Sequence, residues 1–251
     1  MYDPPGYLWV LTIAGVIAML AATCVVLYSG AVRAGLGRGR AALLAGGAAT
    51  VLGGWCAASA VIADHGWYHT RLGHGVPWLP VAVVGFLGLL LALRRIPVVA
   101  RALAAPGMAR YLEWPHSFRM LDGGAFLIIM ALGHLPPLFA LPAGIGDIIA
   151  GLAAPLAARR LAQGGGRRAA LWFNAFGLTD LVVALALGAV TAYQLVHVTP
   201  SGAPISELPL ALVPTVGVPL LLAVHITSVS ALLRARRAPR PAAVLLTAAA
   251  E

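Results

Sequence analysis

Long apolar stretches separated by short polar segments dominate the chain. Most stretches approach or exceed the length of about 20 residues that an α-helix needs to cross the hydrocarbon core of a bilayer. The pattern therefore predicts an all-α, polytopic integral membrane protein with seven transmembrane helices, at residues 7–28, 41–63, 76–93, 120–140, 142–158, 170–196 and 209–233. Only "LP" separates the fourth span from the fifth, which predicts a tight helical hairpin near Pro142. The alternative, one broken element over 120–158, would lower the count to six or make this segment re-entrant.

The arginines fall in alternate segments between these spans, and sixteen of the 17 would then lie on one side, with only Arg71 on the other. Basic residues favour the cytoplasmic side. We therefore predict an external N-terminus, a cytoplasmic C-terminus and a multi-pass protein of the plasma (inner) membrane. The basic segment 94–114 is expected to lie along the inner surface. The spans form a single domain over residues 1–240, and the Ala- and Pro-rich tail at 241–251 is predicted to be disordered.

The composition excludes an ordinary soluble domain, because 61% of the residues are hydrophobic and only 10% are charged. Soluble domains carry about 25% charged residues. The net charge of +9 comes from arginines in short loops, so the lipid bilayer explains it and no nucleic-acid partner is predicted. The two cysteines, Cys24 and Cys56, fall inside apolar stretches and are expected to be buried thiols.

Two acidic residues inside the spans are predicted to lie at the same depth. Asp147 precedes Arg159 by the same number of positions as Asp180 follows Arg168. At about 1.5 Å per residue, this spacing puts both carboxylates roughly 18 Å above the inner basic layer, on neighbouring antiparallel helices. Ionisable groups at this depth usually face the bundle interior and mark a substrate, ion or proton pathway.

Two histidines and an amide join this candidate site. Counted from Arg119 and Arg234, His134 and His225 fall in the same slab, less than about 10 Å thick. Asn174 accompanies them as a hydrogen-bonding group. The structural alternative is that Asp147 caps a neighbouring helix while Asp180 pairs with His225. Arg119 and Asp122, three positions apart, are most simply a local ion pair at the inner end of the fourth span.

A second polar cluster, "DHGWYHTRLGH", lies outside the membrane. Its histidines are weak candidates for a metal site, since two of them are four positions apart: His65, His69 and His74. The alternative is a solvated polar loop at headgroup level.

Two known families resemble parts of this pattern. Seven spans with an external N-terminus resemble the topology of rhodopsins, but the chain has no lysine to form the retinal Schiff base. Membrane hydrolases of the ceramidase and adiponectin-receptor type are similar in carrying histidines on a late span, where this chain offers only His225.

The polar intramembrane site favours transport of a small solute, or proton- or cation-coupled transport, with a small molecule or ion as partner. A membrane-embedded enzyme that depends on a metal or haem is the first alternative, although the sequence requires no cofactor. The second alternative is a membrane sensor or an assembly or interaction protein that uses the basic surface.

Overall fold

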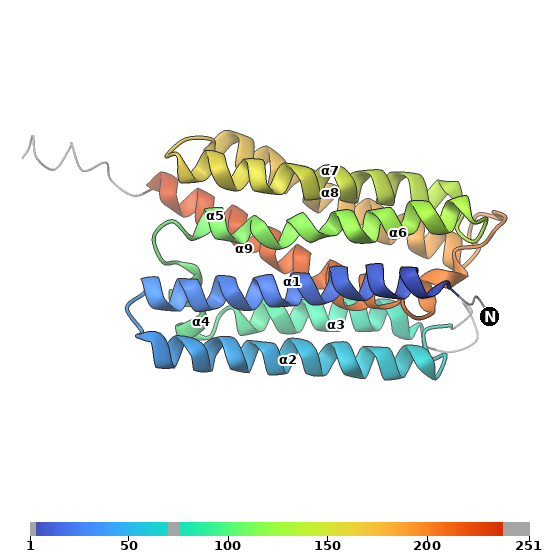
Figure 1. The fold of residues 1–251 in the computed structure, drawn as a ribbon, viewed down its shortest axis with the longest axis horizontal. Helices are drawn as coiled ribbons and strands as arrows, with labels where there is room; N and C mark the ends of the chain where they lie inside the picture. The colour runs from blue at the N-terminus through green and yellow to red at the C-terminus, as the bar shows by residue number, and fades with distance from the viewer. Residues whose placement is uncertain (1–3, 70–75, 238–251) are drawn as a thin grey trace, which may run out of the picture.

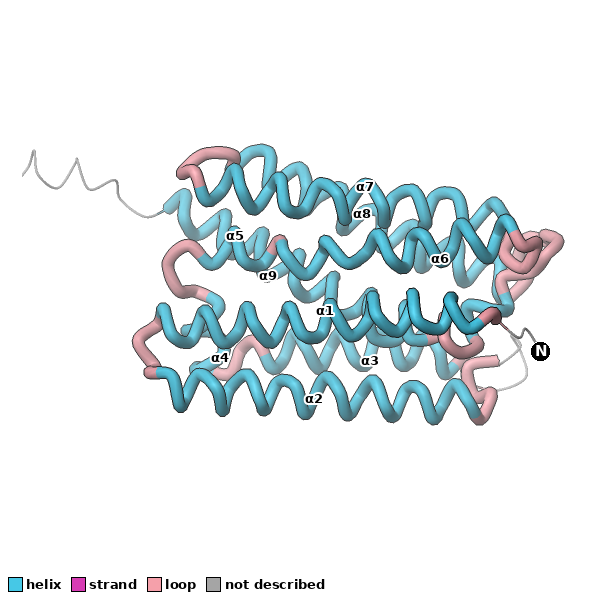
Figure 2. Tube along the Cα trace, in the orientation of Figure 1, coloured by secondary structure: helices cyan, strands magenta, loops and turns pink. Residues whose placement is uncertain are grey.

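The computed structural model describes residues 4–69 and 76–237, and every regular element in these two ranges is a helix. Most of the helices run side by side along the long axis of the molecule, and short connections join them at the two ends (Figures 1 and 2). The elements are α1 (Gly6–Arg33), α2 (Arg38–Asp64), α3 (Trp78–Leu93), α4 (Pro97–Leu103), α5 (Met108–Leu112), η1 (Trp114–Phe118), α6 (Arg119–Ala131), α7 (Pro137–Ala162), α8 (Arg167–Ala192), η2 (Ala203–Ser206), η3 (Val213–Gly217) and α9 (Val218–Arg237).

Several of these helices are long and apolar enough to cross a membrane. Among the described residues, five satisfy this by length and hydropathy: α1, α2, α7, α8 and the continuous segment Val213–Arg234. A sixth appears if α3 and α4 count as one span, although they are bent by 86° at the break between them. The all-helical architecture predicted from the apolar pattern is therefore confirmed.

The segment from α5 to α6 differs from the predicted organisation. The sequence predicts a surface segment over 94–114 and entry into the membrane near residue 120. Instead, α5, η1 and α6 follow one another along the long axis as one rod (Figure 1). Pro115, in the first turn of η1, lacks an N–H group, so the chain continues there as a 3₁₀-helix.

The predicted boundary at Pro142 is wrong. Helix α6 ends at Ala131, a turn follows, and α7 begins at Pro137. Gly133 adopts a φ of 79°, which suits glycine, and Pro136 caps the next helix. Pro142 lies inside α7, where its missing N–H removes only one helical hydrogen bond.

Glycines allow α6 and α7 to approach closely. A Cβ atom added at Gly123 would lie 2.6 Å from the carbonyl oxygen of Gly144, and one at Gly151 would lie 2.9 Å from the backbone nitrogen of Met120. Small residues at such contacts let helix backbones pack tightly without a hydrophobic driving force between them. This contact positions the polar side chains of α6 directly against α7.

Candidate functional site

Four ionisable side chains recur at every third residue along the rod from α5 to α6. They are Glu113, His116, Arg119 and Asp122, and each is at most 1% exposed. A 3₁₀-helix has three residues per turn, so η1 aligns side chains at i and i+3 on one side of the rod. The rod therefore presents a polar stripe to the interior of the bundle.

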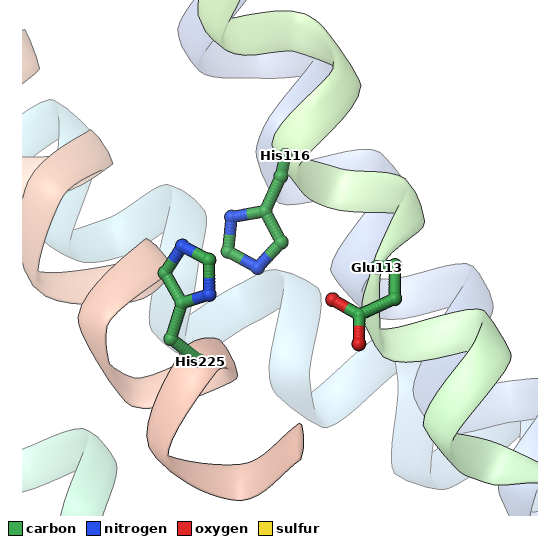
Figure 3. A group of neighbouring side chains, drawn as sticks. All are labelled: Glu113, His116 and His225. Carbon is green, nitrogen blue, oxygen red and sulfur yellow. The ribbon is translucent and has the colours of Figure 1, made fainter. Parts of the chain in front are cut away.

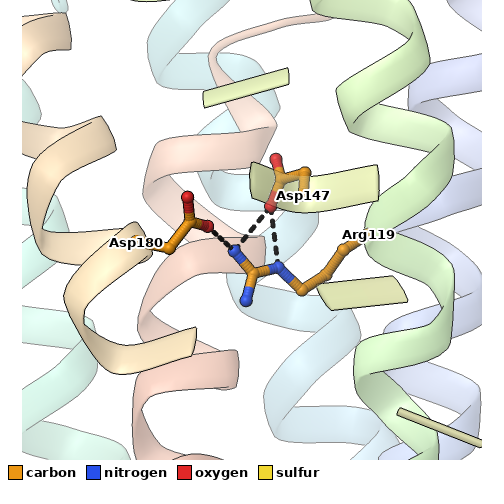
Figure 4. Close-up of polar contacts among 3 residues, drawn as sticks. All are labelled: Arg119, Asp147 and Asp180. Atoms are coloured by element: carbon orange, nitrogen blue, oxygen red, sulfur yellow. Dashed lines mark hydrogen bonds and ion pairs between the residues drawn. The ribbon is translucent and has the colours of Figure 1, made fainter. Parts of the chain in front are cut away.

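Arg119 binds two carboxylates that come from two other helices (Figure 4). Its Nε donates to Oδ1 of Asp147 on α7 at 2.7 Å, and its Nη2 lies 2.7 Å from the same oxygen. Nη2 also donates to Oδ2 of Asp180 on α8. The Arg119 triad, as we call Arg119, Asp147 and Asp180, thus joins α6, α7 and α8 in the interior.

The structure corrects the predicted role of Arg119. The expected local ion pair with Asp122 is not formed, and Oδ1 of Asp122 is buried without a hydrogen-bond partner among the described residues. Because Arg119 lies in the interior, it is not a marker of the inner surface. The depth estimate for His134, which was counted from Arg119, fails for this reason. His134 lies in the exposed turn between α6 and α7, not in the buried site.

A second group of buried polar side chains forms the histidine cluster, defined here as Glu113, His116, Asn174, His225 and Ser228. Asn174 and Ser228 donate to Oε1 of Glu113 at 2.9 and 2.7 Å. Nδ1 of His225 lies 2.8 Å from Oδ1 of Asn174. One amide therefore connects the carboxylate of the rod to the imidazole of α9.

The two imidazole rings of the histidine cluster stack on each other. Their centroids are 3.7 Å apart and their planes differ by 20°. Figure 3 shows both rings beside the carboxylate of Glu113. Both nitrogens of His116, Nε2 of His225 and Oε2 of Glu113 are buried without a hydrogen-bond partner among the described residues. Buried polar atoms are normally satisfied, so four such atoms in one cluster require an explanation.

Gly177 on α8 allows the histidine cluster and the Arg119 triad to lie next to each other. A Cβ atom at this position would overlap Nε2 of His225 and would lie 3.3 Å from Nη1 of Arg119. That Nη1 is itself buried without a partner among the residues described. The two groups therefore form one contiguous polar interior.

An apolar cavity of about 210 Å³ reaches this interior from one end of the bundle. Phe126, Phe139 and Leu181 line it near Asp147, and Tyr193, after the end of α8, lines it further out. Asp147 is the one carboxylate among the lining residues in the described part of the chain. The Arg119 triad therefore adjoins a mostly apolar cavity through Asp147, the one triad member that lines it.

The structure places the candidate site residues in three locations. Asp147 and Asp180 meet at Arg119, as their predicted common depth suggested, and Asn174 and His225 lie beside them in the histidine cluster. His134 is separate from both groups.

Of the predicted extramembrane metal candidates, His65 and His69 each contact a residue outside the candidate set. Helix α2 ends at Asp64, so the four-residue spacing of His65 and His69 does not place them on one helix face. The ring of His65 contacts the carbonyl of Val61, and His69 lies 3.6 Å from Glu207. Among the described residues, the one group with the ligand spacing of a metal site is Glu113 with the two stacked histidines. His74 lies outside the described residues.

Sequence reasoning missed Glu113, His116 and the role of Arg119. The available signal was the three-residue spacing itself, at positions 113, 116, 119 and 122 in a segment otherwise flanked by apolar residues. Such a stripe predicts one polar face on a rod whose remaining surface is apolar.

Substituting Gly146 tests how tightly α7 packs on the Arg119 triad. A Cβ atom there would overlap Oδ1 of Asp180. This carboxylate cannot move away without losing its hydrogen bond from Arg119. We expect Gly146→Ala to lower the free energy of unfolding by about 1–3 kcal/mol, measured by thermal unfolding in detergent. Gly124→Ala on α6 is the matched control, because a Cβ atom there meets only open space. Equal stability of the two variants would contradict this packing.

Comparison with known proteins gives one match. A family described as a domain of unknown function, DUF8737, matches residues 76–233, which include the Arg119 triad and the histidine cluster. No curated protein and no solved structure matches the chain.

Proposed function

The chain belongs to the DUF8737 family, and we propose that it is a proton- or cation-coupled membrane transporter whose coupling site is the Arg119 triad. The observation that carries this proposal is an arginine shared by two carboxylates, one of which, Asp147, lines an apolar cavity.

The charges of the interior do not balance. Four carboxyl groups, those of Glu113, Asp122, Asp147 and Asp180, are buried or nearly so, and Arg119 is the one buried guanidinium in the described part of the chain. If all five groups were ionised, most of the negative charge would be uncompensated. Isolated charges in an apolar medium are strongly disfavoured. The region therefore favours the uptake of protons or of a cation.

The shared arginine provides a two-state element. Nη2 of Arg119 contacts Asp147 on α7 and Asp180 on α8 at the same time. A proton on either carboxyl weakens its ion pair and leaves Arg119 bound mainly to the other helix. Binding of a proton or cation would thereby shift the contact between α7 and α8. Coupling requires such a difference, in which the ion binds one conformation more tightly than the other.

We place seven spans in the membrane, with the rod from α5 to α6 as the fourth. The turns between α1 and α2 and between α7 and α8 lie at the end of the bundle opposite to the start of α1 (Figure 1). Arginines lie at the helix ends that flank these turns, so in this proposal this end is cytoplasmic, the N-terminus is external and the plasma membrane is the site of action. Excluding Arg119 and Arg71, 15 of the 17 arginines remain consistent with this orientation.

Charge movement in reconstituted protein tests the proposal without knowledge of the solute. Proteoliposomes on a solid-supported membrane are exposed to a pH jump and, separately, to Na⁺ and K⁺ jumps. We expect a transient current for at least one of these jumps, because the ion enters a buried site across part of the membrane. Asp147→Asn and Asp180→Asn are expected to abolish it, since each removes one of the carboxylates that share Arg119.

Asp64→Asn is the matched control, because Asp64 lies exposed at the end of α2 and the chemical change is identical. It should retain the wild-type current. A wild-type signal equal to that of empty liposomes would overturn the proposal, and so would a full current in both triad variants. Size-exclusion chromatography confirms that each variant is folded before it is assayed.

A further inference from the structure

We propose that Glu113, His116 and His225 bind one divalent transition-metal ion in the interior of the bundle. One ligand atom from each of these residues lies within 4.8 Å of the other two, and all three side chains are 0% exposed. Figure 3 shows the three side chains converging from the rod and from α9. The site adjoins the Arg119 triad but shares no residue with it, and it does not depend on the transport proposal.

The donor set indicates which metals fit. Two imidazoles and one carboxylate are the protein ligands of many catalytic Zn²⁺ and non-haem Fe²⁺ sites. Two nitrogens bound to the same ion at about 2.1 Å are at most about 4.2 Å apart. In a tetrahedral site this separation is about 3.4 Å. The ligand atoms, which lie within 4.8 Å of one another, therefore have to move closer together to reach coordination distance.

Unpartnered atoms provide an independent indication of a ligand. Oε2 of Glu113, both nitrogens of His116 and Nε2 of His225 are buried and lack hydrogen-bond partners among the described residues. Buried polar atoms that lack protein partners usually contact an ion or an ordered water. A metal ion at this position would satisfy one atom of each of the three side chains.

The orientation of His225 is already fixed in the way that metal-binding histidines are fixed. Its Nδ1 lies 2.8 Å from Oδ1 of Asn174, and the same amide donates to Glu113. With Nδ1 donating, Nε2 carries the lone pair. In metal-binding histidines, the ring nitrogen that does not bind the metal usually donates such a hydrogen bond, which sets the tautomer and the ring orientation. Asn174 would therefore be a positioning residue for two of the ligands.

The ring of His116 has to turn for the ion to bind. The rings are stacked with planes 20° apart, so their lone pairs lie in two nearly parallel planes and do not converge on one point between the rings. Neither nitrogen of His116 makes a hydrogen bond to the described residues. Rotation of the ring about its Cβ–Cγ bond therefore breaks no hydrogen bond to these residues. Binding should therefore separate the stack and leave His225 in place.

The nearby guanidinium does not prevent binding. Arg119 pairs with two carboxylates, so with both ionised the triad carries a net charge of −1. Ionised Glu113 adds another negative charge, and a divalent cation offsets both.

Metal content and spectroscopy test the inference. The full chain is purified in detergent, stripped with a chelator and equilibrated with Zn²⁺, with Fe²⁺ under anaerobic conditions, or with Co²⁺ as a spectroscopic probe. We expect one tightly held ion per chain by elemental analysis, and a Co²⁺ ligand-field spectrum typical of nitrogen and oxygen ligands. Glu113→Gln, His116→Gln and His225→Gln should each lose the ion, and Asn174→Ala should weaken its binding about 10- to 100-fold.

His197→Gln is the matched control, because His197 is exposed in the segment after α8, and it should keep the ion. Absence of tightly bound metal in the wild type would overturn the inference, as would equal metal content in the wild type and in folded His116→Gln. Thermal unfolding of each variant shows whether it is folded. The transient current is also measured on metal-stripped wild-type protein. This measurement tests the transport proposal in the absence of the metal, so the two proposals can fail independently.

Discussion

Arg119→Met is expected to lower the free energy of unfolding by about 3–5 kcal/mol, the usual effect of removing one partner of a buried ion pair. The loss arises because Asp147 and Asp180 would remain buried without a counter-charge. Chemical unfolding in detergent micelles measures it. Arg95→Met is the matched control, because Arg95 is exposed beyond the end of α3, and its change should stay within about 0.5 kcal/mol.

Neutralising the two carboxylates as well shows whether Arg119→Met loses stability through uncompensated charge or through lost packing. In the triple variant Arg119→Met, Asp147→Asn, Asp180→Asn, no formal charge of the triad remains, so we expect most of the lost stability to return. Arg119→Lys should fall between wild type and Arg119→Met, because a single ammonium lacks the fork that reaches both carboxylates. A triple variant no more stable than Arg119→Met alone would contradict the electrostatic explanation.

Asn174→Leu is expected to lower the free energy of unfolding by about 2 kcal/mol, because a buried polar group left without a partner costs about 1–3 kcal/mol and the loss of one further hydrogen bond adds to this. Two groups are affected. Oε1 of Glu113 loses one of its two donors, and Nδ1 of His225 loses its partner. Thermal and chemical unfolding in the same detergent give the value.

Ser228→Ala provides a graded comparison for this network. It removes the other donor to Glu113 but leaves the contact between Asn174 and His225 intact, so its expected effect is about 1 kcal/mol. If Ser228→Ala and Asn174→Leu destabilised the protein equally, the amide would not connect the two ligands as the structure indicates.

The common level of Asp147 and Asp180 along the bundle was predictable because the chain supplies a marker for each of them. Arg159 and Arg168 lie next to the turn between α7 and α8, and each acid is counted along an unbroken helix from one of them. Regular helical rise therefore brought both acids to one level. The positions of the two acids relative to these arginines in the sequence were sufficient for this prediction.

Arg119 was misassigned because its partners are distant in sequence. Asp147 and Asp180 are 28 and 61 residues away, so no local pattern shows that they compensate its charge. An arginine near histidine, serine and glutamate is typical of a loop at the membrane surface. Glu113 and His116 were missed for the same reason, and Pro115 further hid the continuity of the rod.

The short helix α6 has a consequence for biosynthesis. It is the part of the proposed fourth span that follows η1, has 13 residues and begins with Arg119, with Asp122 one turn later, so we expect it to insert poorly on its own. The carboxylates that balance Arg119 are synthesised later, on α7 and α8. In the proposed topology, we therefore expect stable integration of the fourth span to follow the arrival of the downstream hairpin, so that the nascent chain inserts out of sequence order.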